Sequence, residues 1–221
     1  MENTLIPVLF RNRDFIAVDK PAGLSVHNEE EKINLLLILE KQLKLAKLFP
    51  VHRLDKETSG VQILALTETA AKKISQEFES RSVKKRYLGI LRGELKDKTG
   101  VWAIPLSDKG EGRKNPQGLT KLRIPCETRF SILKTSKYFT LCEFHLITGR
   151  QHQIRKHSAV SKHALVGDLR YGEVAYNKKI AYLYKNARMY LHCMNIEVQG
   201  QTILSPTPKC FEELFQAKLK K

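Results

Sequence analysis

Short apolar runs that end in turn residues predict the strands of this chain. Residues 15–18 are apolar and are followed by the turn-forming residues 19–23, an arrangement typical of a strand that runs into a turn. Residues 61–67 are rich in β-branched and apolar side chains and predict a buried strand. Residues 87–93 predict a further strand that ends at a glycine.

Two pairs of such runs predict hairpins. Residues 129–134 and 138–147 flank a short polar segment, and residues 190–198 and 202–204 flank Gln199-Gly200-Gln201. We therefore expect each pair to form two adjacent antiparallel strands.

Apolar residues at helical spacing predict four helices. Residues 31–49 are rich in leucine, and the glutamates at 29–31 favour a helix N-terminus there. Apolar side chains recur at helical spacing in residues 69–80. A third helix is expected at about 151–163, and a closing helix carries the apolar residues of 211–219.

Strands and helices follow one another without regular alternation, which favours an α+β fold over a doubly wound sheet. No internal repeat and no linker divides the chain. We therefore expect residues 1–221 to form one domain.

The net charge of the chain indicates a domain that binds a polyanion. The chain has 39 basic and 23 acidic residues, a net charge of +16, and its 42% hydrophobic content is that of a globular protein. No apolar stretch is long enough to span a membrane, and the N-terminal residues do not resemble a secretory signal. The four cysteines form no Cys-x-x-Cys pair, so we expect free thiols in a reducing cytoplasm.

The segment 105–126 is long, polar and rich in glycine, with five basic and two acidic residues. A loop of this length in a compact domain is usually functional. Contact with RNA and a merely disordered excursion are both compatible with its sequence.

The segment His52-Arg53-Leu54-Asp55-Lys56-Glu57-Thr58-Ser59-Gly60 places an arginine and a carboxylate at the entrance of a predicted strand. In an extended chain, Arg53 and Asp55 lie on one face and Leu54 on the other. A reactive carboxylate is held rigidly at such a position. The alternative interpretation is a surface ion pair between Arg53 and Asp55.

The segment 149–157, Gly-Arg-Gln-His-Gln-Ile-Arg-Lys-His, opens a predicted helix after a strand. Exposed backbone N–H groups and basic side chains at a helix start suit phosphate contact. His152 and His157 lie about 140° apart around a helix, which disfavours a shared metal. Arg155 is placed to hold a carboxylate in its ionised form, although a solvated basic helix face explains the same residues.

A third basic segment lies between Arg81 and Arg92 and contains Tyr87. An aromatic ring within a cationic approach suits nucleic-acid binding, because a base stacks on the ring. The alternative is that Tyr87 is a half-buried strand residue.

Five segments together resemble the motifs of the RluA-type pseudouridine synthases. They are KPAGLSVH at 20–27, HRLDKETSG at 52–60, KKRYLGILRG at 84–93, GRQHQIRKH at 149–157 and VGDLRYG at 166–172, in the order of that family. The resemblance implies a mixed, mainly antiparallel sheet with flanking helices and a central catalytic cleft. It also implies isomerisation of uridine to pseudouridine within RNA. The first motif lies so close to the N-terminus that we expect no S4-like RNA-binding domain.

The resemblance also assigns roles to residues. It implies that Asp55 is the catalytic carboxylate, that Tyr87 lies beside the target base, and that Arg155 is the partner of Asp55. Arg53 is similar to the arginine that helps to take the place of the flipped base. Position 151 is Gln where the family often has a smaller or hydroxyl residue. We expect the RNA-binding residues to be Arg53, His52, Lys84, Lys85, Arg86, Arg150, His152 and Gln153.

The isomerisation transfers no group and changes no oxidation state, so we expect no cofactor and no metal. An ionised carboxylate is able to act as a nucleophile, as a stabiliser of positive charge on the sugar, or as a base, and the sequence leaves these roles open. The expected partner is a structured loop of ribosomal or transfer RNA, bound by a cytoplasmic monomer. Asp168 is expected to be a turn or helix-capping residue.

Three other functional classes fit less well. A non-catalytic RNA-binding module explains the charge but not the carboxylate within the motif at 52–60. A kinase-like phosphotransferase lacks a glycine-rich nucleotide loop, and a metal-dependent nuclease needs clustered carboxylates where this chain has dispersed ones.

Overall fold

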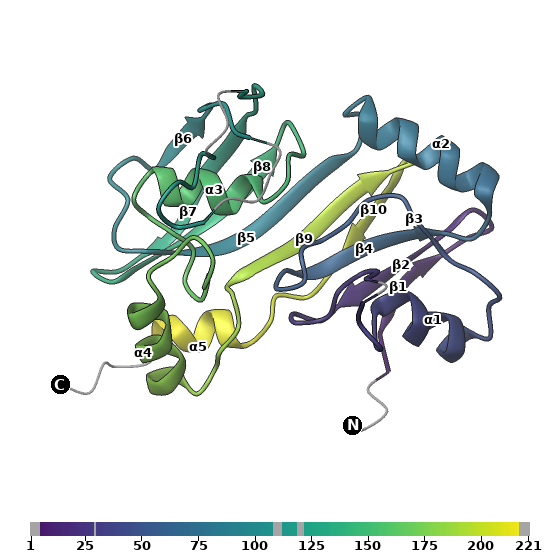
Figure 1. The fold of residues 1–221 in the computed structure, drawn as a ribbon, viewed down its shortest axis with the longest axis horizontal. Helices are drawn as coiled ribbons and strands as arrows, with labels where there is room; N and C mark the ends of the chain where they lie inside the picture. The colour runs from purple at the N-terminus through teal and green to yellow at the C-terminus, as the bar shows by residue number, and fades with distance from the viewer. Residues whose placement is uncertain (1–4, 29, 108–111, 119–121, 217–221) are drawn as a thin grey trace. The chain divides into compact units, whose positions relative to one another are not determined.

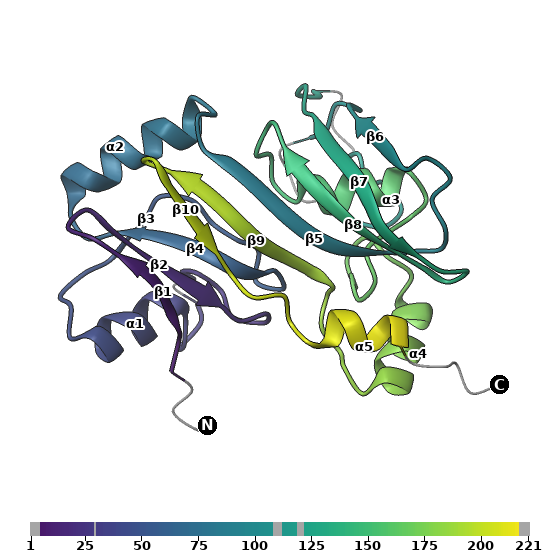
Figure 2. The same cartoon turned by 180° about the vertical axis from the view of Figure 1, so that it is seen from behind.

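The computed structural model describes residues 5–28, 30–107, 112–118 and 122–216. The backbone forms two compact units. The first contains Met1–Lys85 and Cys193–Pro206, and the second contains Arg86–His192 and Thr207–Lys221. Figures 1 and 2 show the same chain from opposite sides, and each unit is described by itself below.

The first unit contains a mainly antiparallel group of strands (Figure 1). Its strands are β1 (Val8–Arg11), β2 (Phe15–Lys20), β3 (Phe49–Pro50), β4 (Ser59–Ala65), β9 (Leu191–Val198) and β10 (Gln201–Leu204). Their order is β1-β2-β4-β9, with β10 paired to β9 and β3 paired to β4. The predicted strand at 61–67, the strand at 15–18 and the hairpin of β9 and β10 are confirmed, whereas β1 has no counterpart in the prediction.

Helix α1 (Leu35–Leu43) is shorter than the helix predicted over 31–49. It begins after Asn34, whose side chain accepts a hydrogen bond from the Leu37 N–H group, and it ends at Lys44, which is left-handed. Its buried residues Leu35 and Leu39 belong to a core that includes residues of β2 and β4. The predicted N-terminus was wrong because the Asn34 cap lies inside the leucine-rich run.

Helix α2 (Glu68–Glu79) matches the helix predicted over 69–80. Thr67 caps it by accepting a hydrogen bond from the Ala70 N–H group, and Ala70 and Ile74 form its buried side. This buried side packs on β3 and β4.

The second unit contains a four-stranded antiparallel group. Its strands are β5 (Lys84–Arg92), β6 (Thr99–Trp102), β7 (Thr128–Thr135) and β8 (Phe139–Leu146), in the order β5-β8-β7-β6. The predicted strand at 87–93 and the predicted hairpin at 129–147 are confirmed. Strand β6 was not predicted, because its alternation covers only four residues.

Three helices accompany these strands: α3 (Gln153–Val160), α4 (Val174–Tyr184) and α5 (Cys210–Gln216). Both views show α3 next to β7 and β8 (Figure 2). Helix α3 begins two residues later than predicted because His152 has a φ of 54°. Helix α4 was not predicted, and the end of the predicted closing helix, residues 217–219, lies outside the described residues.

The described residues contain ten strands in one mainly antiparallel sheet and five helices, which confirms the α+β prediction. The prediction that residues 1–221 form a single catalytic domain stays a prediction. All four cysteines are free thiols. None of the described helices has the length and apolar character needed to cross a membrane.

Candidate active site

The chain around Asp55 is tied to strand β4 by a buried glutamine. Gln62 is fully buried, accepts a hydrogen bond from the Leu54 N–H group at 3.0 Å and donates one to the His52 carbonyl at 2.8 Å. The Thr58 N–H group donates to the carbonyl of Asp55 at 3.1 Å, which closes the turn after it. These contacts fix the backbone of Asp55, and its side chain is half-buried.

A buried lysine connects this segment to the earlier motif at 20–27. The Lys20 ammonium is fully buried and donates to the carbonyls of Leu24 at 2.7 Å, Pro21 at 3.0 Å and Lys56 at 3.2 Å. The Gly23 N–H group donates to the same Lys56 carbonyl at 2.8 Å. The two motifs of the first unit therefore form one hydrogen-bonded structure.

Arg53 lies at the surface of the first unit. Its Nη1 atom is 3.5 Å from Nε2 of His27, another residue of the early motif. The alternative interpretation, a surface ion pair between Arg53 and Asp55, stays a prediction.

The ring of His52 is held by contacts with other residues of the first unit. Its Nε2 atom accepts a hydrogen bond from the Ile63 N–H group at 2.9 Å, and its ring stacks on Phe78 at 4.6 Å between centroids. Burial, with the charge of Lys85 as a smaller cause, lowers the pKa of His52 to about 3. His52 is therefore neutral at physiological pH, and its RNA-binding role stays a prediction that cannot rely on a positive charge.

The basic residues at the start of β5 have different surroundings. Lys84 forms an ion pair with Glu197 at 3.1 Å in the first unit. Lys85 lies over the ring of Phe78 at 5.5 Å, and burial lowers its pKa. In the second unit, Arg86 is 4.0 Å from Glu143. The exposed Lys84 is thus the most accessible of the three cations.

Tyr87 lies on β5 in the second unit, opposite Phe144 of β8. Its side chain is 8% exposed, so Tyr87 is a strand residue as the alternative expects, but it is buried and not half-buried. Its predicted place beside a target base stays a prediction.

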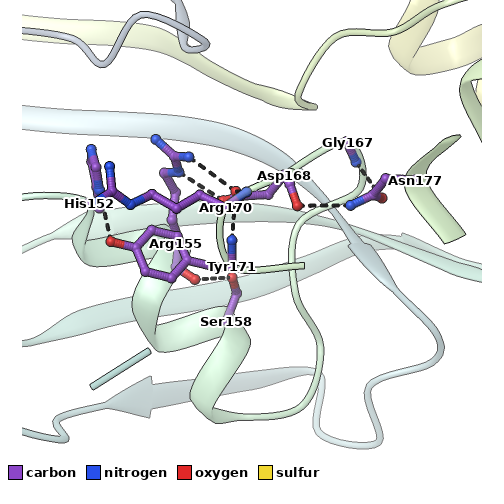
Figure 3. Close-up of polar contacts among 8 residues, drawn as sticks. All are labelled: His152, Arg155, Ser158, Gly167, Asp168, Arg170, Tyr171 and Asn177. Atoms are coloured by element: carbon purple, nitrogen blue, oxygen red, sulfur yellow. Dashed lines mark hydrogen bonds and ion pairs between the residues drawn. The ribbon is translucent and has the colours of Figure 1, made fainter. Parts of the chain in front are cut away.

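Arg155 lies on α3 and is 3% exposed. Its Nε atom donates to Oδ2 of Asp168 at 2.8 Å and its Nη2 atom to Oδ1 at 3.0 Å, a two-pronged pair that Figure 3 shows. Buried guanidinium groups need such a partner, because desolvation of an unpaired charge is costly. The predicted pairing of Arg155 with Asp55 involves residues of the two units and stays a prediction.

His152 and Tyr171 adjoin this pair (Figure 3). The His152 Nδ1 atom is 2.9 Å from the Tyr171 hydroxyl, and the guanidinium of Arg155 lies 5.4 Å from the centre of the Tyr171 ring. Tyr171 also lines a cavity of about 180 Å³ together with Arg92, Lys162 and other residues of the second unit. The motifs at 149–157 and 166–172 therefore contact each other at Arg155 and His152.

Gln153 is 2% exposed, and its side chain forms hydrogen bonds within the second unit. Its Oε1 atom accepts hydrogen bonds from the Thr148 hydroxyl and the Arg150 N–H group, and its Nε2 atom donates to the Glu127 carbonyl and the Thr128 hydroxyl. RNA contact by Gln153 stays a prediction that these contacts do not support. Arg150 is half-buried beside it.

Comparisons with known proteins identify the family. The model of the family described as RNA pseudouridylate synthase matches residues 14–160. The chain is 31% identical over 211 residues to tRNA pseudouridine synthase C of Salmonella typhimurium, covering 88% of this chain and 80% of that protein. It is 32% identical over 199 residues to the ribosomal large subunit pseudouridine synthase C of Vibrio parahaemolyticus, covering 87% of this chain and 61% of that protein.

The chain belongs to the RNA pseudouridylate synthase family. The resemblance to RluA-type enzymes is thereby confirmed, and the chain is an RNA pseudouridine synthase, an isomerase. The fold agrees: the structure of human RNA Pseudouridylate Synthase Domain Containing 4 matches with a TM-score of 0.77 and 24% identity, covering 95% of this chain and 91% of that one.

Family membership overturns the alternatives of a non-catalytic RNA-binding module, a kinase-like phosphotransferase and a metal-dependent nuclease. Among the residues that the structure describes, no group of three acidic, histidine or cysteine side chains is arranged to hold a metal ion.

Sequence reasoning missed two contacts of this pseudouridine synthase. Lys20 was treated as part of a turn, and only its burial and its three carbonyl acceptors reveal its connecting role. Asp168 was expected to be a turn or capping residue. Its Oδ1 atom does accept hydrogen bonds from the Arg170 and Tyr171 N–H groups, but the same carboxylate also binds Arg155.

Proposed function

We propose that Asp55 is the catalytic carboxylate of the isomerisation. The observation that carries this proposal is the way its peptide is held: Gln62 and Lys20 fix the chain on both sides of it, while its own side chain remains half-buried. A site held by buried hydrogen bonds from rigid elements keeps a reacting group in place. Asp55 also lies in the segment that resembles the family's catalytic motif.

The reaction breaks the bond between N1 of uracil and C1′ of the ribose and forms a bond between C5 and C1′. The proton on C5 is then lost, and N1 gains one, so no other reactant is consumed. Asp55 would take part by attacking the substrate, by stabilising positive charge on the sugar, or by accepting the C5 proton.

Tyr87 and Arg155 complete the proposed site. In this proposal the Tyr87 ring contacts the target base, and the guanidinium of Arg155 keeps the carboxylate of Asp55 ionised. Arg53, which is exposed beside His27, offsets the unstacking cost when the uridine is flipped out.

The proposed substrate is a uridine in a structured loop of transfer or ribosomal RNA. Two relatives support these two classes by name, because one is named a tRNA synthase and the other a ribosomal large subunit synthase. The net charge of +16 supports binding to either RNA. We also propose that the enzyme acts as a monomer in the cytoplasm, which sedimentation of the purified protein and fractionation of cells test.

The role of Asp55 is tested by Asp55→Asn, with Glu57→Gln as a matched change in the same turn. Pseudouridine formation is measured by mass spectrometry of RNA after a single turnover. We expect Asp55→Asn to lower the rate on the order of 10³-fold or more while RNA affinity stays the same or rises. Glu57→Gln should keep a rate near that of the wild type, and a comparable rate in Asp55→Asn would refute the assignment.

The substrate is identified by mapping pseudouridines in cellular RNA with and without this protein. A position that disappears in its absence and returns with the wild type, but not with Asp55→Asn, is the target. If all positions lost lie outside transfer and ribosomal RNA, the proposed substrate class is wrong.

A further inference from the structure

The two-pronged pair between Arg155 and Asp168 fixes the direction of the guanidinium. Two parallel hydrogen bonds, at 2.8 and 3.0 Å, place the guanidinium in a defined plane, which one bond alone would leave free to turn. The pair is almost completely excluded from solvent, with side chains 3% and 1% exposed. Neither bond involves Nη1, the third nitrogen of Arg155.

The carboxylate of Asp168 is itself held by its own loop. Its Oδ1 atom accepts hydrogen bonds from the Arg170 N–H group at 2.9 Å and the Tyr171 N–H group at 3.1 Å. Rotation of the Asp168 side chain would break these bonds as well as the pair with Arg155. The carboxylate therefore serves as a fixed support.

The loop that carries Asp168 is anchored to helix α4 (Figure 3). The Asn177 side chain donates to the Asp168 carbonyl at 2.8 Å and accepts from the Gly167 N–H group at 2.9 Å. Gly167 has a φ of 81°, and a Cβ atom there would lie 2.0 Å from the Arg188 carbonyl oxygen, so this position requires glycine. The support for Arg155 thus extends from α3 through the loop to α4.

We propose that Asp168 is a positioning residue for the isomerisation, because it orients the guanidinium of Arg155. The inference rests on the proposed role of Arg155 in catalysis. Asp168 acts through Arg155 and not on the uridine. Stability alone does not require a charged pair here, since well-packed apolar residues replace buried ion pairs at little or no cost in other proteins.

The first test is Asp168→Asn, with Glu173→Gln as the matched control. The asparagine retains an oxygen for the Arg170 and Tyr171 N–H groups but presents an N–H₂ group or a neutral oxygen to Arg155. Glu173 is also a carboxylate of the second unit paired with an arginine, Arg92, and lies outside the Arg155 pair. We expect Asp168→Asn to lower the single-turnover rate about 10²-fold, the effect of a displacement near 1 Å, with RNA affinity little changed. Glu173→Gln should leave both unchanged.

The second test is a double-mutant cycle that uses Arg155→Gln. If Asp168 acts through Arg155, Asp168→Asn adds no further loss of rate in the Arg155→Gln background. The double variant also removes both charges of the buried pair together. We expect the midpoint temperature of its thermal unfolding to lie above that of either single variant. A double variant that is folded but as slow as Arg155→Gln separates positioning from folding.

The outcomes distinguish this inference from the proposed function. A wild-type rate in Asp168→Asn overturns the positioning role. So does an effect of Asp168→Asn on the rate that is as large in the Arg155→Gln background as in the wild type. Neither result changes the proposed roles of Asp55 and Arg155. A wild-type rate in Arg155→Gln overturns the proposed role of Arg155 and the inference with it. A loss of rate in Asp168→Asn that is fully accounted for by loss of folded protein shows a role in stability alone and also overturns the inference.

Discussion

At the scale of single residues, His52 shows how a motif residue supports the fold close to Asp55, the proposed catalytic carboxylate. Its ring nitrogen accepts the Ile63 N–H group of β4, and its face packs on Phe78 of α2. The first of these contacts requires an unprotonated Nε2 atom and therefore a neutral ring. The burial that lowers its pKa to about 3 therefore links the stability of the first unit to pH.

We expect His52→Gln to flatten the acid limb of the stability profile. Between the folded pKa of about 3 and the unfolded value of about 6.5, the unfolded chain binds more protons, so stability falls as pH decreases through this range. Glutamine still offers an oxygen to the Ile63 N–H group but does not titrate. The measurement is urea unfolding at pH values from 7 to 4, followed by circular dichroism. Parallel profiles for the variant and the wild type would contradict this linkage.

Lys20→Met tests the connection between the motifs at 20–27 and 52–60. The change keeps an unbranched side chain but leaves the carbonyls of Pro21, Leu24 and Lys56 without this donor. Each buried acceptor that is left without a donor costs up to about 3 kcal/mol. We therefore expect the free energy of unfolding to fall by a few kcal/mol and the reaction to be slower. Urea unfolding and single-turnover rates measure the two effects. Unchanged values for both would mean that the two motifs hold their shape without the ammonium.

At the scale of elements, β4 and β9 approach each other closely at Gly60. This residue has a φ of 110°, and a Cβ atom there would lie 2.1 Å from the Cys193 carbonyl oxygen. The glycine therefore allows β4 to start next to β9, directly after the segment that carries Asp55.

Gly60→Ala should destabilise the first unit much more than Gly23→Ala. Both glycines have a positive φ, but a Cβ atom at Gly23 would have no neighbour within 4 Å. The control therefore reports backbone strain alone, roughly 1 kcal/mol, whereas Gly60→Ala adds overpacking against backbone, about 1–3 kcal/mol more. Urea unfolding of the two variants gives the comparison. Equal losses of unfolding free energy would show that the backbone at Cys193 moves away from the new Cβ atom at no cost.

The elements that could be predicted from the sequence are those whose signal is local. The hairpin of β7 and β8 and helix α2 each combine a clear period with a turn or a capping residue. Helix α1 was predicted too long because apolar residues at helical spacing continue past the left-handed Lys44, and because the glutamates at 29–31 favoured a helix start before the Asn34 cap. The start of α3 was predicted two residues too early, because the residue type histidine does not predict the left-handed φ of His152.

The residues of the candidate site also differ in how far the sequence predicts them. Asp55 and Arg155 could be proposed as site residues from the sequence because each lies in a contiguous motif. The support that Asp168 gives to Arg155 could not, because it joins residues 13 positions apart and depends on how the loop after α3 folds back. Only the Gly-Asp pair in the motif at 166–172 hinted at a constrained carboxylate.

At the scale of the whole molecule, the excess of positive charge predicts how RNA affinity responds to salt. The net charge of +16 is distributed over residues that include partly compensated cations such as Lys84, which pairs with Glu197. Each phosphate contact to RNA releases a counterion and contributes about 0.7 to 0.9 to the slope of log affinity against log salt. With six to ten such contacts, affinity falls about 10³–10⁵-fold between 50 and 200 mM salt.

Arg150→Gln separates local phosphate contact from the overall charge. Lys178→Gln on α4 removes the same formal charge at an exposed position with no predicted RNA role. If Arg150 contacts a phosphate, its variant lowers the salt slope by about 0.7 to 0.9. The Lys178 variant should leave the slope unchanged, because only a cation that contacts a phosphate contributes to it. The measurement is fluorescence anisotropy of labelled RNA in a salt series, with Asp55→Asn as the background so that turnover does not interfere. Equal slopes for both variants would assign the salt dependence to the general field of the protein and remove Arg150 from the RNA-binding residues.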